Sequence, residues 1–88
     1  MSHTSQVQSL ITTSDQPTMA LLSAQDIGAY AYERRIRLGM SQNELAQKIG
    51  VNSRTILRFE NGNGANLTSV LHILNELGIE LLGRVAAP

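Results

Sequence analysis

The sequence contains no cysteine, which excludes disulfide bonds, thiolate metal ligands and thiol catalysis and fits a protein of the reducing cytoplasm. It also lacks any run of about 18 apolar residues, so we expect no membrane-spanning helix. The N-terminus has no basic stretch followed by an apolar segment, and we therefore expect no signal peptide. With 88 residues the chain is predicted to form one domain, and cores of this size often gain stability by oligomerising.

Side chains suited to catalysis are scarce. The two histidines, His3 and His72, are far apart in the sequence, and neither has a second ligand at metal-binding spacing. The segment Gly62-Asn63-Gly64 follows a predicted helix, so it lacks the strand-to-helix setting of a phosphate-binding loop. We therefore expect neither an enzyme nor a bound metal or cofactor.

The formal net charge is zero, but the charges are unevenly distributed. Between residues 34 and 58 lie six of the seven basic residues and a single acidic one, Glu44, so this stretch carries a net charge of +5. Binding to phosphates requires a local basic face, although an ordinary solvated surface accounts for the count equally well. The basic residues concerned are Arg34, Arg35, Arg37, Lys48, Arg54 and Arg58.

Apolar residues at helical spacing and recurring cap residues predict four helices. Ser41 and Glu44 have capping-box spacing, in which each side chain binds the backbone N–H of the other residue. Gly50 is expected to make the tight turn between the second and third helices, where positive φ is needed and the small Ala46 permits a close crossing. The predicted helices, with their core residues, are 23–38 (Ile27, Ala31, Leu38), 41–50 (Leu45, Ala46, Ile49), 52–60 (Ile56, Phe59) and 66–78 (Leu67, Val70, Leu71, Leu74, Leu77).

The two ends of the chain are predicted to differ from this helical domain, which spans residues 19–78. Residues 1–18 are rich in Ser, Thr and Gln and are expected to form a flexible tail. Translation could start at Met1 or at Met19, and the sequence does not distinguish the two. In residues 79–88 the apolar residues alternate, which predicts a short β-strand. A lone strand needs a partner, so we expect it to pair with a second copy of the chain; a frayed apolar tail is the alternative. The residues expected to join the dimer are Ile79, Leu81, Leu82 and Val85.

One long motif resembles a known family. Residues 35–51 read RIRLGMSQNELAQKIGV and are followed by Ile56 and by Phe59-Glu60-Asn61-Gly62, a pattern similar to the Cro/C1-type (XRE) helix-turn-helix family over residues 24–78. The Asn66-Leu67-Thr68 and Ile73-Leu74 segments, with a terminal strand in place of a fifth helix, resemble more narrowly the HipB-like antitoxins of HipA kinase toxin systems. The resemblance implies a mainly α, lambda-repressor-like four-helix DNA-binding domain whose C-terminal strand pairs across a homodimer.

The same resemblance implies a function. A HipB-like chain is expected to bind an inverted repeat in double-stranded operator DNA, to repress its own operon, and to bind a HipA-like kinase toxin in a type II toxin-antitoxin system. It is expected in the bacterial cytoplasm, associated with the nucleoid. The alternative is a stand-alone small repressor or controller protein without a toxin partner, and a weaker one is a helix-turn-helix kept only for protein contacts. Beyond the four helices we expect room only for the strand and not for a sensor domain, which favours the antitoxin or a small controller protein of a similar sort.

Family positions also imply residue roles. Gln42 begins the second helix and is expected to contact a phosphate. Arg54 and Arg58 share a face that points away from the core, and Arg54 is expected to contact a guanine. Arg35 and Glu60 are expected to form a structural ion pair, whereas Arg34 and Arg37 are expected on a solvated face. Lys48 is equally consistent with a DNA contact and with a position on a solvated face. The predicted DNA-binding residues are Gln42, Lys48, Asn52, Ser53, Arg54, Thr55, Arg58 and Asn61.

Overall fold

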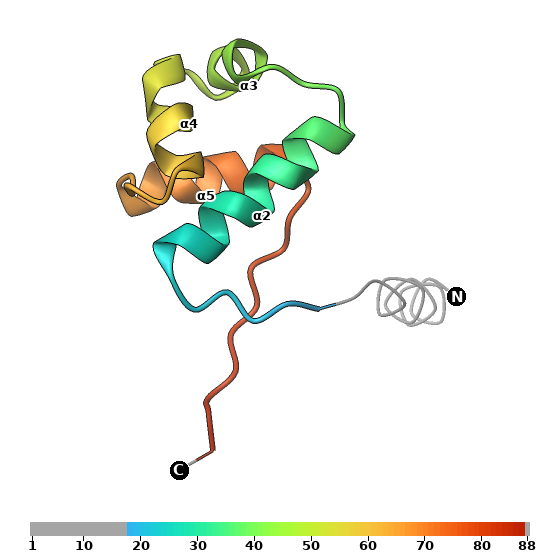
Figure 1. Cartoon of the computed structure of the whole chain (residues 1–88), viewed down its shortest axis with the longest axis vertical. Coiled ribbons are helices and arrows are strands. Elements are labelled where there is room, and N and C mark those ends of the chain that lie inside the picture. Colours follow the sequence, from blue (N-terminus) through green and yellow to red (C-terminus); the bar gives the residue numbers. More distant parts are fainter. Residues whose placement is uncertain (1–17, 88) are drawn as a thin grey trace, which may run out of the picture.

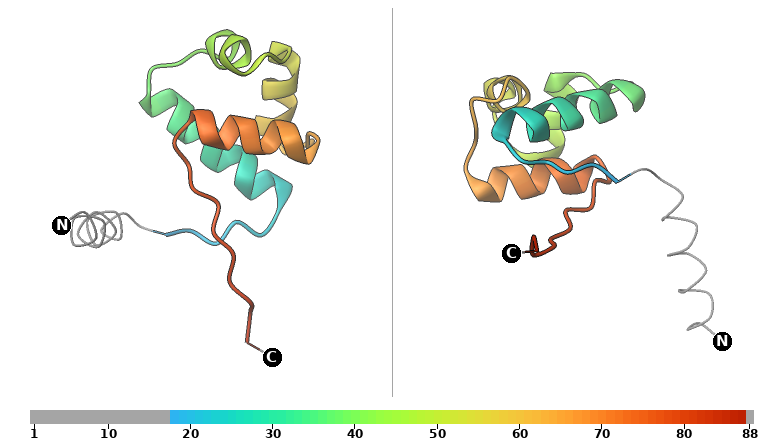
Figure 2. Two further views of the ribbon diagram at one scale, coloured as in Figure 1. Left: turned by 180° about the vertical axis from the view of Figure 1, so that it is seen from behind. Right: turned by 60° about the horizontal axis from the view of Figure 1, so that its bottom comes forward.

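The computed structural model describes residues 18–87, and its secondary structure there consists of four helices. These are α2 (Ala24–Arg37), α3 (Gln42–Ile49), α4 (Ser53–Glu60) and α5 (Leu67–Glu76). Helix α4 packs against α2 and α3, and α3 also packs against α5, while α2 passes in front of α5 in the view of Figure 1 and lies on a different level from it in Figure 2. The predicted mainly α, lambda-repressor-like four-helix fold is confirmed. The predicted N-terminal tail falls on residues 1–17, outside the described residues, except for its last residue.

Each helix begins at a side chain that accepts a hydrogen bond from a backbone N–H of the first turn. This satisfies one of the donors that a helix N-terminus leaves without a partner. Ser41 and Glu44 form the predicted capping box, with N···O distances of 3.0 and 2.8 Å. The hydrogen bonds from the Ser41 backbone and hydroxyl lower the pKa of Glu44, because they stabilise its carboxylate. The four N-cap residues are Ser23, Ser41, Asn52 and Asn66.

Gly50 makes the turn of the helix-turn-helix. Its φ is +73°, a left-handed conformation that glycine adopts without the steric cost of a Cβ. The next residue, Val51, donates its N–H to the Ala46 carbonyl at 3.0 Å, which closes the C-terminus of α3. Ala46 itself is buried in the core. The local geometry therefore matches the turn predicted from the sequence.

The buried core contains fewer residues than the apolar pattern predicted. Its members are Ala31, Leu45, Ala46, Ile56, Phe59, Ile73, Leu74 and Leu77.

Three of the predicted core residues, Leu38, Leu67 and Leu71, are exposed. At the end of α2 the core-facing position is occupied by Arg35, whose guanidinium donates to the Met40 carbonyl at 2.8 Å. On α5 the residues in or against the core are Val70, Ile73, Leu74 and Leu77, whereas Leu67 and Leu71 lie outside this packed face. An apolar pattern shows which residues share a face, whereas burial depends on what packs against that face.

The chain beyond α5 leaves the helical domain. Gly78 has φ of +70°, and Ile79 donates its N–H to the Leu74 carbonyl at 2.8 Å and packs against the core. Residues 80–87 then run away from the helices without regular secondary structure in this single chain (Figure 1). Leu81, Leu82 and Val85 are exposed. Strand pairing needs a second backbone, so it remains a prediction. None of the described helices is long and apolar enough to cross a membrane.

Candidate nucleic-acid interface

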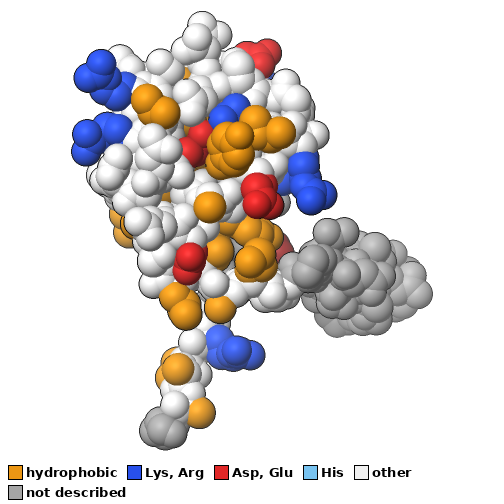
Figure 3. Space-filling view, in the orientation of Figure 1, with side chains coloured by type: hydrophobic (Ala, Val, Ile, Leu, Met, Phe, Trp, Pro, Cys, Tyr) orange, Lys and Arg blue, Asp and Glu red, His pale blue; other side chains and the backbone are white. Residues whose placement is uncertain are grey.

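The exposed face of α4 carries the two arginines predicted to contact DNA. Ile56 and Phe59 bury the opposite face of this helix in the core, so Arg54 and Arg58 project into solvent. Ser53 and Thr55 are half-buried along the edges of the helix, and Asn61 is its exposed C-cap. Figure 3 shows two cationic groups side by side over α4. Two exposed guanidinium groups on one helical turn form a surface suited to a polyanion.

Asn52 already has a structural task at the start of α4. Its side-chain oxygen accepts a hydrogen bond from the Arg54 backbone N–H at 2.8 Å and caps the helix. The side-chain amide nitrogen is an additional donor on the same exposed residue. Asn52 therefore stabilises α4 through its side-chain oxygen and remains exposed at the start of the helix.

Arg35 and Glu60 form a nearly dry ion pair between α2 and α4. The guanidinium donates to both carboxylate oxygens, at 2.6 and 2.9 Å, and the two side chains are 7% and 4% exposed. The hydrogen bond to Glu60 is the main reason that the pKa of Arg35 is raised. The guanidinium carbon also lies 5.4 Å from the centre of the Tyr32 ring, within cation–π range. The pair therefore holds α4 against α2.

Gln42 joins this network from a third helix. Its amide nitrogen donates to Glu60 Oε1 at 3.0 Å, so the side chain bridges the N-terminus of α3 to the end of α4. One carboxylate thereby positions three helices. The backbone N–H groups of the first turn of α3 and the positive end of its dipole make this terminus a suitable phosphate site. Gln42, which the family resemblance predicts to contact a phosphate, therefore links α3 to α4 in the structure.

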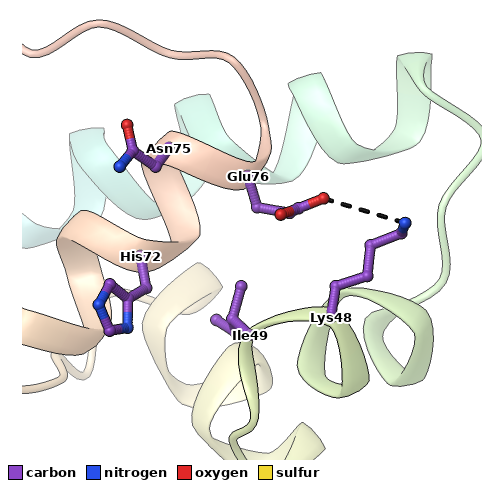
Figure 4. Close-up of a pocket in the computed structure, with 5 residues that line it drawn as sticks. All are labelled: Lys48, Ile49, His72, Asn75 and Glu76. Atoms are coloured by element: carbon purple, nitrogen blue, oxygen red, sulfur yellow. Dashed lines mark ion pairs between the residues drawn. The ribbon is translucent and has the colours of Figure 1, made fainter.

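Lys48 lies apart from the face of Arg54 and Arg58. Its ammonium group is 4.0 Å from a carboxylate oxygen of Glu76, across an open hollow of about 480 Å³ between α3 and α5 (Figure 4). Ile49, His72 and Asn75 line the same hollow. Within residues 18–87, no three His, Asp or Glu side chains gather closely enough to hold a metal ion. The structure thus groups Lys48 with α5, whereas Gln42 lies at the start of α3 and the other predicted DNA contacts lie on α4 or at its caps.

Two residues that position the helices were not identified from the sequence. Arg34, expected on a solvated face, is exposed, but it also donates from Nε to the Leu77 carbonyl at 2.8 Å and caps the C-terminus of α5. Gly28 lies where α2 crosses α4, and a Cβ there would be 2.2 Å from the Phe59 carbonyl oxygen. A glycine in the middle of a predicted helix is the signal that could have indicated this close approach.

Comparisons with known proteins agree with this geometry. The model of the family described as Helix-turn-helix matches residues 32–83. A solved HipB variant in complex with an O2 20-mer is 29% identical, with a TM-score of 0.73, over 81% of this chain and all of the other. HipB in complex with an O4 20-mer is 30% identical, with a TM-score of 0.72, over 80% of this chain and all of the other. A HipA-HipB-O2-O3 complex matches at 28% identity and a TM-score of 0.72, again over 80% and 100%. No curated protein sequence matches the chain.

Proposed function

Because the chain belongs to the Cro/C1-type helix-turn-helix family, we propose that it is a HipB-like antitoxin that binds operator DNA and a HipA-like kinase toxin and represses its own operon. The observation that supports DNA binding best is the exposed face of α4. Arg54 and Arg58 project from that face, and the buried pair of Arg35 and Glu60 holds the helix in place. This combination is typical of a rigid helix presented to a major groove.

The proposed DNA complex follows from these positions. Helix α4 enters the major groove, where a guanidinium binds O6 and N7 of a guanine through two parallel hydrogen bonds. The N-terminus of α3 lies against a phosphate, which sets the register of α4 without reading sequence. Two copies of the chain related by a two-fold axis would place their α4 helices about 34 Å apart, in successive major grooves over an inverted repeat.

Substitutions at the two contact types are expected to differ in kind. Arg54→Ala should reduce discrimination at one base pair of each half-site by about 10- to 100-fold, because a bidentate contact to guanine is lost. Gln42→Ala should weaken binding to specific and random duplexes alike, because it disturbs a phosphate contact. Fluorescence anisotropy on a selected duplex and its single-base variants would measure both effects. Arg37→Ala, an exposed arginine at the end of α2, is the matched control. Equal losses on specific and random DNA in both variants would refute the assignment.

The proposed dimer depends on residues beyond α5. Leu81, Leu82 and Val85 are exposed in the single chain, and a strand edge there would leave its N–H and C=O groups without partners. Truncation after Gly78 is expected to convert a dimer into a monomer and to lower DNA affinity at least tenfold, because each monomer would contact only one half-site. Light scattering after size exclusion measures the first effect. Truncation after Val85 is the control. A dimer that survives truncation after Gly78 argues against strand pairing.

The toxin is the partner that separates an antitoxin from a stand-alone repressor. The match to the solved HipA-HipB-O2-O3 complex covers the whole length of the matched chain in that complex, and it supports the antitoxin. We expect affinity purification of the tagged protein from its native cell to recover a kinase-like protein, identified by mass spectrometry. The recovered kinase should lose activity when the purified antitoxin is added back. Recovery of the protein bound to DNA but without a kinase would favour a stand-alone repressor.

A further inference from the structure

The reading face of α4 contains one apolar residue that the DNA contacts described above do not use. Leu57 follows Arg54 by three positions and directly precedes Arg58, and the residue is 46% exposed. The other large apolar residues of this helix, Ile56 and Phe59, are buried. Figure 3 shows apolar surface next to the cationic groups over α4. Packing within the chain therefore does not account for the exposed part of Leu57, which lies between the two arginines.

The neighbours of Leu57 indicate what covers it. Arg54 and Arg58 attract a polyanion, and Asn61, one turn further along the helix, adds a polar side chain to the same exposed face. A protein partner would need a broader apolar surface than this single side chain provides. On the edges of DNA bases in the major groove, the C5-methyl group of thymine is the apolar group available to an apolar side chain. The partner that matches both the charge and the apolar contact is thus a thymine beside the arginine-contacted bases.

We propose that Leu57 is a specificity-determining residue that packs against a thymine methyl group, and this inference rests on the proposed DNA-binding function. Arg54 and Arg58 are separated by about 6 Å along the helix axis, since an α-helix rises about 1.5 Å per residue. Leu57 lies about 4.5 Å along the axis from Arg54 by the same rise. Neighbouring base pairs are about 3.4 Å apart, so the thymine lies within about two base pairs of the base contacted by Arg54.

The test removes the methyl group from the DNA and the side chain from the protein. A duplex is first selected by the wild-type protein from a random library. Each thymine in both half-sites is then replaced symmetrically by deoxyuridine, which differs only by the methyl group. Binding of the wild type, Leu57→Ala and Leu38→Ala is measured by fluorescence anisotropy. Leu38 is the matched control, because it is a 44% exposed leucine at the C-cap of α2, away from α4. Circular dichroism verifies that all three proteins are folded.

One thymine is expected to depend on Leu57. At that position, replacement by deoxyuridine should weaken wild-type binding about fourfold per half-site, or about 15-fold for the symmetric duplex, as expected for one buried methyl group in each half. Leu57→Ala should bind the thymine and deoxyuridine duplexes equally, whereas Leu38→Ala should behave like the wild type. Specific binding with no thymine whose effect depends on Leu57 overturns this inference alone. Failure to select any duplex overturns the proposed DNA-binding function together with it.

Discussion

Replacing Arg35 by methionine is expected to lower the free energy of unfolding by about 3–5 kcal/mol, because it leaves the Glu60 carboxylate buried without its cationic partner. The Glu60 side chain is only 4% exposed, so water cannot replace the two lost hydrogen bonds. The Met40 carbonyl also loses its donor. Small domains have a total stability of about 5–15 kcal/mol, so the loss is a large fraction of the total and should lower the urea midpoint strongly. Urea denaturation followed by circular dichroism measures the change.

The matched control replaces both charges. The double variant Arg35→Met with Glu60→Leu removes the pair without leaving a buried charge, and apolar replacements of buried ion pairs are often close to neutral. It should therefore recover more than half of the stability lost in Arg35→Met. Tyr32 and Gln42, which contact the pair from α2 and α3, stay unchanged in both proteins. If the single and double variants were equally unstable, the loss would come from packing of the arginine stem and not from the unpaired carboxylate.

Gly28→Ala is the second substitution expected to have a large effect. A Cβ at this position would lie 2.2 Å from the Phe59 carbonyl oxygen and 3.0 Å from that of Glu60. Both atoms belong to the backbone of α4, so a side-chain rotation cannot relieve the clash and the two helices must move apart. We expect a loss of about 3 kcal/mol, at the upper end of what overpacking costs, although alanine has the higher helix propensity by about 1 kcal/mol.

The movement should also affect DNA binding, because α4 is the helix proposed to enter the major groove. Gly28→Ala is expected to weaken specific binding even at a temperature where the variant is fully folded, since the separation of α2 and α4 disturbs the Arg35–Glu60 pair. Thermal denaturation and anisotropy on the selected duplex measure the two effects. Ala29→Gly is the control: this exposed neighbour should lose about 1 kcal/mol through propensity and bind DNA normally. A Gly28→Ala protein more stable than the wild type would contradict the close approach.

Much of the candidate interface was predictable because it depends on positions within one helix. Arg54 and Arg58 share a face whatever α4 packs against, since four residues make about one turn. The pairing of Arg35 with Glu60 was expected from the family resemblance, and the structure places the two side chains in direct contact. The bridge from Gln42 to Glu60 and the partner of Lys48 were not predicted, because they depend on the relative positions of separate helices.

The sequence by itself determined where the helices begin and how the turn is made. Ser41, Asn52 and Asn66 cap helices through groups two or three residues away, and Gly50 takes a conformation set by its missing Cβ. These are interactions between near neighbours in the chain. The tertiary structure alone decided that Leu38 and Leu71 are exposed, that Arg34 caps α5 from 43 residues away, and that Gly28 meets the α4 backbone. Such features depend on where helices cross, and a crossing is set by the summed packing of many side chains instead of a local pattern.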